Sequence, residues 1–199
     1  DVYQRQAELS AKELRLGGLR IDPKTNIGSR VTYYNNVKIR NLKNQKSEIT
    51  QVKGLPKNPK LSNISWSPDQ KRIALTNTTE TGVELWVLEL ENGSVTKLTE
   101  SNLNSNIGSV INWFSDSENM LVKMISNNRR PLIDTNKIVP DGPTISTNFG
   151  EKAQNRTYQD LLKNKFDEHN FEQLSTSTIY KVSIDAVSYT HLTLPTIGC

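Results

Sequence analysis

The sequence ISWSPD at residues 64–69 returns as INWFSD at residues 111–116, and this repeat decides the fold class. The two tryptophans, Trp66 and Trp113, are 47 residues apart, and the β-rich stretch after each of them keeps the same offset. A fixed period of about 20–50 residues is typical of repeat architectures, in which each repeat is one supersecondary unit. The chain is therefore predicted to contain successive copies of one β unit.

Each unit is predicted to include a hairpin. Between the two tryptophans lie β-rich runs at residues 83–90 and 95–98, joined by Asn92-Gly93. Asn-Gly favours a type I′ turn, because both central residues of that turn need positive φ. A partial earlier copy of this hairpin is found at residues 37–52, and a later one begins at 179–185.

Four short strands in about 40–50 residues, with a Trp on one strand and an Asp in the next turn, are typical of a propeller blade. A large indole ring is suited to filling the space between adjacent blades. The predicted fold class is all-β: a partial β-propeller of about three to four blades with an inserted α-helix. A two-sheet sandwich is the alternative, since alternation and turn spacing fit both folds, but the in-register repeat favours the propeller.

Residues 126–178 break the period and are predicted to be an insertion between strands. The first half is rich in Pro and Gly, which indicates a loop. The second half predicts a helix at about residues 155–172, with Thr157 as N-cap. The residues that support this helix are Asp160 three positions after the cap and, at helical spacing, Tyr158, Leu161, Leu162 and Phe166.

The tail differs from the Lys- and Asn-rich chain before it. AVSYTHLTLPT at residues 186–196 carries no charge and resembles the translation of a transposase adapter used in sequencing libraries. We therefore expect residues 1–185 to be a partial N-terminal propeller and residues 186–199 to be a translated adapter artefact. The alternative is a genuine carboxy-terminal strand, because residues 187–194 are rich in β-forming types. The nucleotide sequence from codon 186 onward distinguishes the two.

Composition excludes several classes of function. The formal net charge of +4 comes from 25 basic and 21 acidic residues that are interspersed, without a basic run that carries aromatics, so no nucleic-acid partner is expected. No stretch approaches the roughly 18 consecutive apolar residues of a membrane span, so no membrane partner is expected either. No metal site or cofactor is predicted, and the single cysteine, Cys199, has no disulfide partner.

Several motifs resemble one peptidase family. LGGLRID at residues 16–22, PDGP at 140–143 and above all RTYQDLLK at 156–163 are similar to the glutamyl endopeptidase branch of the prolyl oligopeptidase family of serine peptidases. The resemblance covers roughly residues 14–185. Its most specific part is the Arg-Thr-Tyr-Gln-Asp-Leu-Leu segment, which is not a general propeller feature.

This resemblance implies an amino-terminal propeller that caps an α/β-hydrolase domain with a Ser-Asp-His triad. The nucleophile of such a domain lies on a Gly-x-Ser-x-Gly elbow, and this chain contains no such motif. We therefore assign it no catalytic residue, although its parent is expected to be a serine-type peptidase. Its peptide substrate would bind through the missing hydrolase domain, and the propeller would restrict access to it.

Two other functions stay open. One is a non-enzymatic, TolB-like propeller scaffold that binds a protein partner, and sequence downstream of residue 185 would distinguish it. The other is an isolated three-blade module, which is disfavoured because propellers close with about four to eight blades. The compartment is also open: periplasmic or secreted in a bacterium if a signal peptide was lost, with cytoplasm or plastid as alternatives.

Three arginines are candidate substrate-binding residues: Arg20, Arg30 and Arg156. A peptidase that prefers Glu needs a cation, and a guanidinium binds a carboxylate through two parallel hydrogen bonds. Structural ion pairing is the competing explanation for each of them.

The remaining polar candidates are expected to be structural. His169 lies among acidic residues without a nucleophile and is expected at a solvated helix end. Asp22, Asp69 and Asp116 are expected to cap turns, because Asp bonds its own backbone there.

Overall fold

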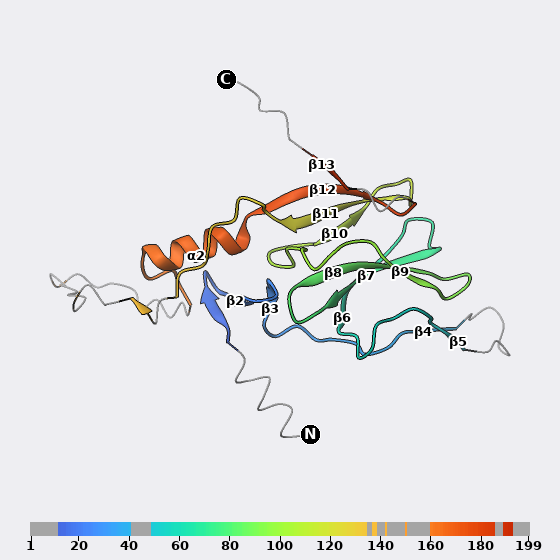
Figure 1. The fold of residues 1–199 in the computed structure, drawn as a ribbon, viewed down its shortest axis with the longest axis horizontal. Coiled ribbons are helices and arrows are strands. Elements are labelled where there is room, and N and C mark those ends of the chain that lie inside the picture. The colour runs from blue at the N-terminus through green and yellow to red at the C-terminus, as the bar shows by residue number, and fades with distance from the viewer. Residues whose placement is uncertain are drawn as a thin grey trace, which may run out of the picture.

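A computed structural model describes residues 12–40, 49–134, 137–138, 142, 150, 160–185 and 189–192. Within these residues the chain is mostly β-strand, with one α-helix at one end of the molecule (Figure 1). No helix in this part of the chain is long and apolar enough to cross a membrane.

Two four-stranded antiparallel sheets form the centre of the structure. The first contains β6 (Leu61–Trp66), β7 (Arg72–Thr78), β8 (Val83–Glu89) and β9 (Val95–Lys97). The second contains β10 (Ile111–Trp113), β11 (Asn119–Ile125), β12 (Ser177–Ser183) and β13 (Tyr189–His191). In both sheets the spatial order of the strands is their order in the chain.

The two tryptophans occupy the same place in these two sheets. Trp66 pairs with Ile73, and Trp113 pairs with Met120, so the register repeats with the 47-residue offset of the sequence. A sandwich with Greek-key connections would exchange strands between its sheets, whereas each sheet here is a consecutive meander. The predicted partial β-propeller is confirmed, with these sheets as its two complete blades.

Two smaller sheets precede the blades in the chain. A three-stranded sheet contains β1 (Leu14–Leu16), β2 (Leu19–Asp22) and β3 (Ile27–Gly28), and a two-stranded sheet contains β4 (Lys38–Ile39) and β5 (Thr50–Gln51). The hairpin predicted within residues 37–52 is thus present, although its turn lies outside the described residues.

The main core lies between the two blades. It joins buried apolar side chains of β7 and β8 to those of β10, β11 and β12, among them Ala74, Leu85, Val87, Ile111, Met120, Val122 and Val182. Trp113 packs against this cluster, and its indole nitrogen donates a hydrogen bond to the Ser65 carbonyl oxygen at 3.2 Å. The first strands of the two blades, β6 and β10, are therefore neighbours.

The Asn92-Gly93 hairpin is present between β8 and β9, but the predicted type I′ turn is wrong. Gly93 has a φ of 70°, and Asn92 is not among the residues with positive φ. The Asn92 side chain instead accepts hydrogen bonds from the backbone nitrogen and the hydroxyl of Ser94, at 2.8 and 2.7 Å. The connection is consequently wider than a two-residue turn.

The insertion between β11 and β12 contains a helix, but this helix starts later than predicted. Helix α2 spans Lys165–Ser175, and its N-cap is Asn164, whose side chain accepts from the backbone nitrogens of Phe166 and Asp167. Residues 161–164 are not helical. Asp160 has a φ of 63°, which a right-handed helix does not accommodate. The predicted cap, Thr157, lies outside the described residues.

Helix α2 packs on the three-stranded sheet through a small core of its own. Leu174 is fully buried with Leu16 and Ile21, and Phe171 packs at the edge of this cluster. Gly17 lies under the Phe171 ring with a φ of 57°, and a Cβ atom there would be 3.0 Å from that ring. The insertion therefore holds β1 and β2 against α2, and Figure 1 shows β2 beside the helix.

Strand β13 comes from the segment assigned to an adapter. It pairs with β12 from Val182 to Tyr180, and Tyr180 contacts the His191 ring. Residues of β-forming type can pair with any open strand edge, so this pairing does not distinguish a native strand from an adapter. The division at residue 185 stays a prediction.

We predict that Trp113→Ala lowers the free energy of unfolding by about 3 kcal/mol, because it opens the core between the blades and removes a hydrogen bond. Trp66→Ala in this chain is the matched control, since Trp66 is 56% exposed. The midpoint of urea denaturation measures both. Equal midpoints for the two variants would contradict the packing described for Trp113.

A second prediction concerns Glu84, which is 8% exposed on β8. Burial raises the pKa of Glu84, but the hydrogen bonds from Trp86, Asn77 and Lys97 together lower it by more than burial raises it. The pKa of Glu84 is therefore below its ordinary value. Because the pKa is lowered, the carboxylate stabilises the fold fully above the ordinary pKa of 4.5. This stabilisation is lost as the pH falls through the pKa of Glu84 in the folded state.

Glu84→Gln should therefore destabilise the protein most near neutral pH, and the deficit should shrink on acidification. Free energies of unfolding from urea titrations at several pH values measure this difference. Glu91→Gln, an exposed change in the turn after β8, is the control. A deficit that is independent of pH would show that the charge of Glu84 does not stabilise the fold.

Candidate functional site

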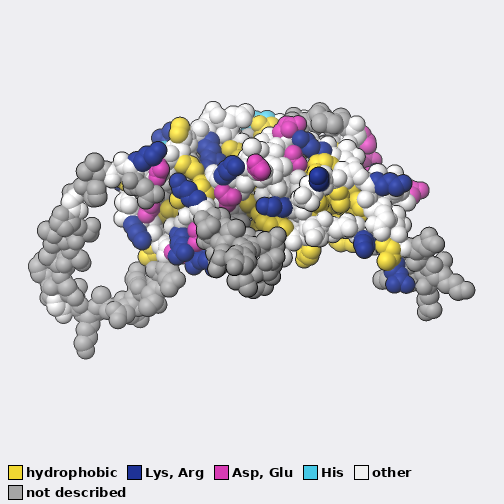
Figure 2. Space-filling model, turned by 60° about the horizontal axis from the view of Figure 1, so that its bottom comes forward, with side chains coloured by type: hydrophobic (Ala, Val, Ile, Leu, Met, Phe, Trp, Pro, Cys, Tyr) yellow, Lys and Arg dark blue, Asp and Glu magenta, His cyan; other side chains and the backbone are white. Residues whose placement is uncertain are grey.

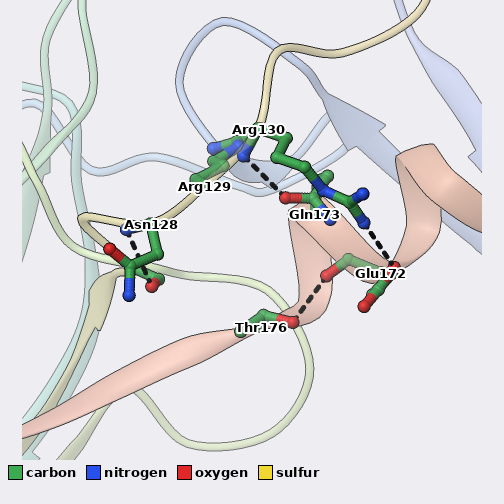
Figure 3. A pocket seen from close by; sticks show the side chains of 7 residues that line it. Asn128, Arg129, Arg130, Glu172, Gln173 and Thr176 are labelled. Carbon is green, nitrogen blue, oxygen red and sulfur yellow. Dashed lines mark hydrogen bonds and ion pairs between the residues drawn. The ribbon is translucent and has the colours of Figure 1, made fainter.

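A polar cavity of about 320 Å³ lies where α2 ends and the insertion begins. Its walls come from residues 126–130, directly after β11, and from the last turn of α2. Figure 3 shows the lining side chains of Asn128, Arg129, Arg130, Glu172, Gln173 and Thr176.

Two hydrogen bonds hold the wall of residues 126–130 against the helix. The backbone nitrogen of Arg130 donates to Oε1 of Gln173 at 2.7 Å. The Arg130 guanidinium donates to Oε2 of Glu172 at 3.3 Å (Figure 3). Both charged side chains are largely exposed, so this ion pair is weak.

Arg129 differs from its neighbour because it is half-buried and is not paired with an acid. Its Nη1 donates to Oδ1 of Asn26 at 3.0 Å. Burial lowers the pKa of Arg129 from its ordinary value, yet an arginine stays protonated in proteins. Among the described residues, no carboxylate lies within 4.0 Å of its guanidinium.

A chain of buried asparagines holds the acceptor for Arg129 in place. Nδ2 of Asn26 donates to Oδ1 of Asn104 at 2.7 Å, and both residues are 1% exposed. Nδ2 of Asn104 in turn donates to the carbonyl oxygens of Leu174 and Thr176, each at 3.0 Å. These contacts join the turn before β3, the loop before β10 and the end of α2. The guanidinium is thus oriented before any ligand arrives.

The charges of this cavity suit the binding of an anion. The cavity carries two guanidinium groups and one carboxylate, and Arg130 already engages that carboxylate. Arg129 therefore provides a positive charge whose remaining N–H groups can serve a carboxylate in the bidentate manner. No Ser, Cys or Lys nucleophile with an adjacent base is found among its lining residues.

Two of the three arginines predicted to bind substrate are engaged in ion pairs. Arg20 lies 3.7 Å from Glu13 and 3.8 Å from Asp160, and Arg30 lies 3.8 Å from Glu13. A hydrogen bond from Ser29 and the charges of the nearby arginines lower the pKa of Glu13, whereas burial raises it by a smaller amount. The pKa of Glu13 is therefore below its ordinary value. The third, Arg156, lies outside the described residues. The substrate-binding role of all three stays a prediction.

The other polar candidates lie in turns and on the helix. Asp69 accepts from Ser67 and Lys71, and Asp116 accepts from two backbone nitrogens of its own turn. Asp22 accepts from Lys24 and Thr25 in the same way. His169 lies within α2, where its Nε2 is 3.0 Å from the Pro131 carbonyl oxygen. These contacts agree with turn capping, but the predicted position of His169 at a solvated helix end is wrong, because it lies in the middle of α2 and is partly buried.

Sequence reasoning did not identify Arg129 as a candidate. Its sequence signal is an Arg-Arg pair at the start of the insertion, which is indistinguishable from a solvated surface pair. Only the burial of Arg129 and its contact with Asn26, which is 103 residues away in the chain, set it apart.

Comparisons with known proteins identify relatives along most of the chain. It is 31% identical over 195 residues to a probable chloroplastic glutamyl endopeptidase of Arabidopsis thaliana. It is 27% identical over 191 residues to the protein of the same description from Oryza sativa subsp. japonica. Both alignments cover 90% of this chain, which spans 20% of each relative. No family model matches the chain.

Solved structures with partial similarity include two acylaminoacyl peptidases. The enzyme of Pyrococcus horikoshii is 24% identical, with a TM-score of 0.33, over 52% of this chain and 14% of that one. An acylaminoacyl peptidase in complex with Z-Gly-Gly-Phe-chloromethyl ketone is 16% identical, with a TM-score of 0.40, over 80% of this chain and 21% of that one.

We predict that Asn104→Ala loosens α2 from the blades, because it leaves the Asn26 amide and two helix-end carbonyls without their partner. The cost should be about 1–3 kcal/mol of unfolding free energy. Hydrogen exchange of residues 165–175 should become faster, while exchange in β7 and β8 should not. Asn128→Ala, at an exposed position of the same cavity, is the control; unchanged exchange in α2 would argue against the asparagine chain as its anchor.

Proposed function

Since this chain belongs to the prolyl oligopeptidase family of serine peptidases, in its glutamyl endopeptidase-like branch, we propose that it is part of the propeller of an enzyme that cleaves peptides after Glu. The observation that carries the proposal is the similarity to two probable glutamyl endopeptidases along 90% of the chain. The catalytic residues would lie elsewhere in the full-length protein, because this chain has no nucleophile elbow.

The propeller would control access of the peptide to the active site. The first strands of the two complete blades, β6 and β10, are neighbours through the bond from Trp113 to Ser65. In a propeller the blades surround a central channel, so the innermost strands form its wall. A substrate that enters through such a channel must be narrow, which favours peptides over folded proteins.

Preference for Glu requires a cation that contacts the substrate carboxylate. Arg129 is supported as the first candidate by its half-buried guanidinium, which faces no acid within the described part of the chain. Arg20 and Arg30 are weaker candidates, since Glu13 and Asp160 already compensate their charge. Arg156 remains a candidate from the family resemblance alone.

The function is tested with the full-length protein that contains this region. We expect it to hydrolyse peptides after Glu and to be inactivated by a serine-directed inhibitor. Absence of any peptide hydrolysis would overturn the peptidase function itself, and cleavage without regard to Glu would overturn only the specificity.

Arg129→Ala in that enzyme should raise the KM for Glu substrates by about 10- to 100-fold, the equivalent of one charge-assisted hydrogen bond. The KM for a matched Gln peptide should stay nearly constant, since a neutral amide does not need the charge. Arg130→Ala is the control, because Arg130 is exposed and paired with Glu172. If Arg129→Ala leaves the Glu-to-Gln preference intact, this arginine does not recognise the substrate carboxylate.

A further inference from the structure

The hairpin β4–β5 has the register of the last two strands of a blade. In each complete blade the third strand pairs with the fourth in the same way. The equivalent pairs are Ile39 with Thr50, Trp86 with Lys97 and Tyr180 with His191. Ile39 and Trp86 are 47 residues apart, and so are their partners Thr50 and Lys97. The hairpin β4–β5 therefore corresponds to the outer half of a third blade.

The inner half of that blade is not formed by the residues before it. The repeat would place its first two strands at residues 14–19 and 25–31. Those residues instead form the separate sheet of β1, β2 and β3, in which Leu14 pairs with Ile21, and this sheet packs on α2. Within the part of the chain described by the structure, β4 pairs only with β5.

The missing half leaves an apolar surface on β6. Trp66 is 56% exposed and Ile64 is 46% exposed. Val37, Ile39, Val52 and Leu55 of the hairpin segment pack on the cluster around Ile73 and Leu88, to which Trp66 does not belong. Figure 2 views the side that is at the bottom of Figure 1, where β4, β5 and β6 lie, and shows hydrophobic side chains at the surface among the charged ones.

The second blade shows what covers this surface in a complete pair of blades. Trp113, the equivalent of Trp66, packs on the core between the blades and donates its indole N–H to the backbone of the preceding first strand. The strand that would receive Trp66 in the same way is the first strand of the β4–β5 blade, which the described residues do not contain.

We propose that two further antiparallel strands of the same polypeptide pair with the open edge of β4, complete its blade and cover Trp66. The indole N–H of Trp66 then donates to a backbone carbonyl of the innermost added strand, as that of Trp113 does to Ser65. A segment of the same polypeptide is the occupant because the hairpin already supplies half of a blade in register. The curated relatives also have ample chain for it, since this chain spans only 20% of their length. The inference concerns the assembly of the propeller from its blades and does not depend on peptidase activity.

The test uses the full-length natural protein that contains this region. Hydrogen exchange of the backbone amides of residues 36–40 should be about 100-fold slower than that of an open strand edge, because pairing protects both sides of β4. Exchange at the rate of an open edge would overturn the proposal. Protection that disappears on dilution would also overturn it, since a second copy of the chain would then be the occupant.

A substitution pair gives an independent measurement in the same protein. Trp66→Ala should lower the midpoint of thermal unfolding by about as much as Trp113→Ala. Leu161→Ala is the control, because Leu161 is 53% exposed and lies in the insertion. A midpoint for Trp66→Ala that matches the control would show that the ring stays in solvent, and the exchange experiment decides the matter if a variant does not fold.

Discussion

The contact between the two complete blades is the interaction on which the rest of the structure depends. Side chains of β7 and β8 meet those of β10, β11 and β12 in one buried cluster, and each fully buried aliphatic residue contributes about 1.5–3 kcal/mol. Trp113 closes the inner end of this contact with its hydrogen bond to Ser65. The turns reinforce this contact, since the backbone nitrogen of Asp69 donates to the hydroxyl of Ser117 in the neighbouring blade and the Arg72 guanidinium donates to the Ser117 carbonyl oxygen.

The insertion is attached to this unit by a chain of buried polar contacts, in addition to the apolar packing of α2 on the three-stranded sheet. Asn26 and Asn104 are almost fully buried: Asn26 donates a hydrogen bond to Asn104, and Asn104 donates to two carbonyl oxygens at the end of α2. A buried amide is costly unless it is paired, so this chain of amides specifies one position for the helix. The same pairing orients the Arg129 guanidinium, which couples the fold of the insertion to the candidate binding site.

The two unequal tryptophans show how a repeat can be regular in sequence and incomplete in structure. Trp66 and Trp113 pair with equivalent residues of their second strands, but among the described residues only Trp113 has a preceding first strand to pack on. Strand pairing within a blade is determined by residues a few positions apart, whereas burial of the indole ring depends on a neighbouring blade. The exposed ring thus marks where the partial propeller is open.

Details of turns and caps could be predicted only in part. Asn92-Gly93 correctly indicated a hairpin, but the Asn92 side chain binds the Ser94 backbone and produces a wider turn. The helix of the insertion was expected, yet Asn164 rather than Thr157 supplies its N-cap in the described residues, after the left-handed Asp160. Several nearby Asn, Asp and Thr residues can each cap a helix, so sequence cannot choose between them.

The sequence alone determined the repeat, its period and its register, because alternating apolar residues and turn residues act over short distances. It also carried the family resemblance. The tertiary structure decided which charges are compensated: Arg20 and Arg30 meet Glu13, while Arg129 is half-buried beside Asn26. It also decided which blade surface lies open. Burial and ion pairing join residues far apart in the chain, and no local pattern specifies such contacts.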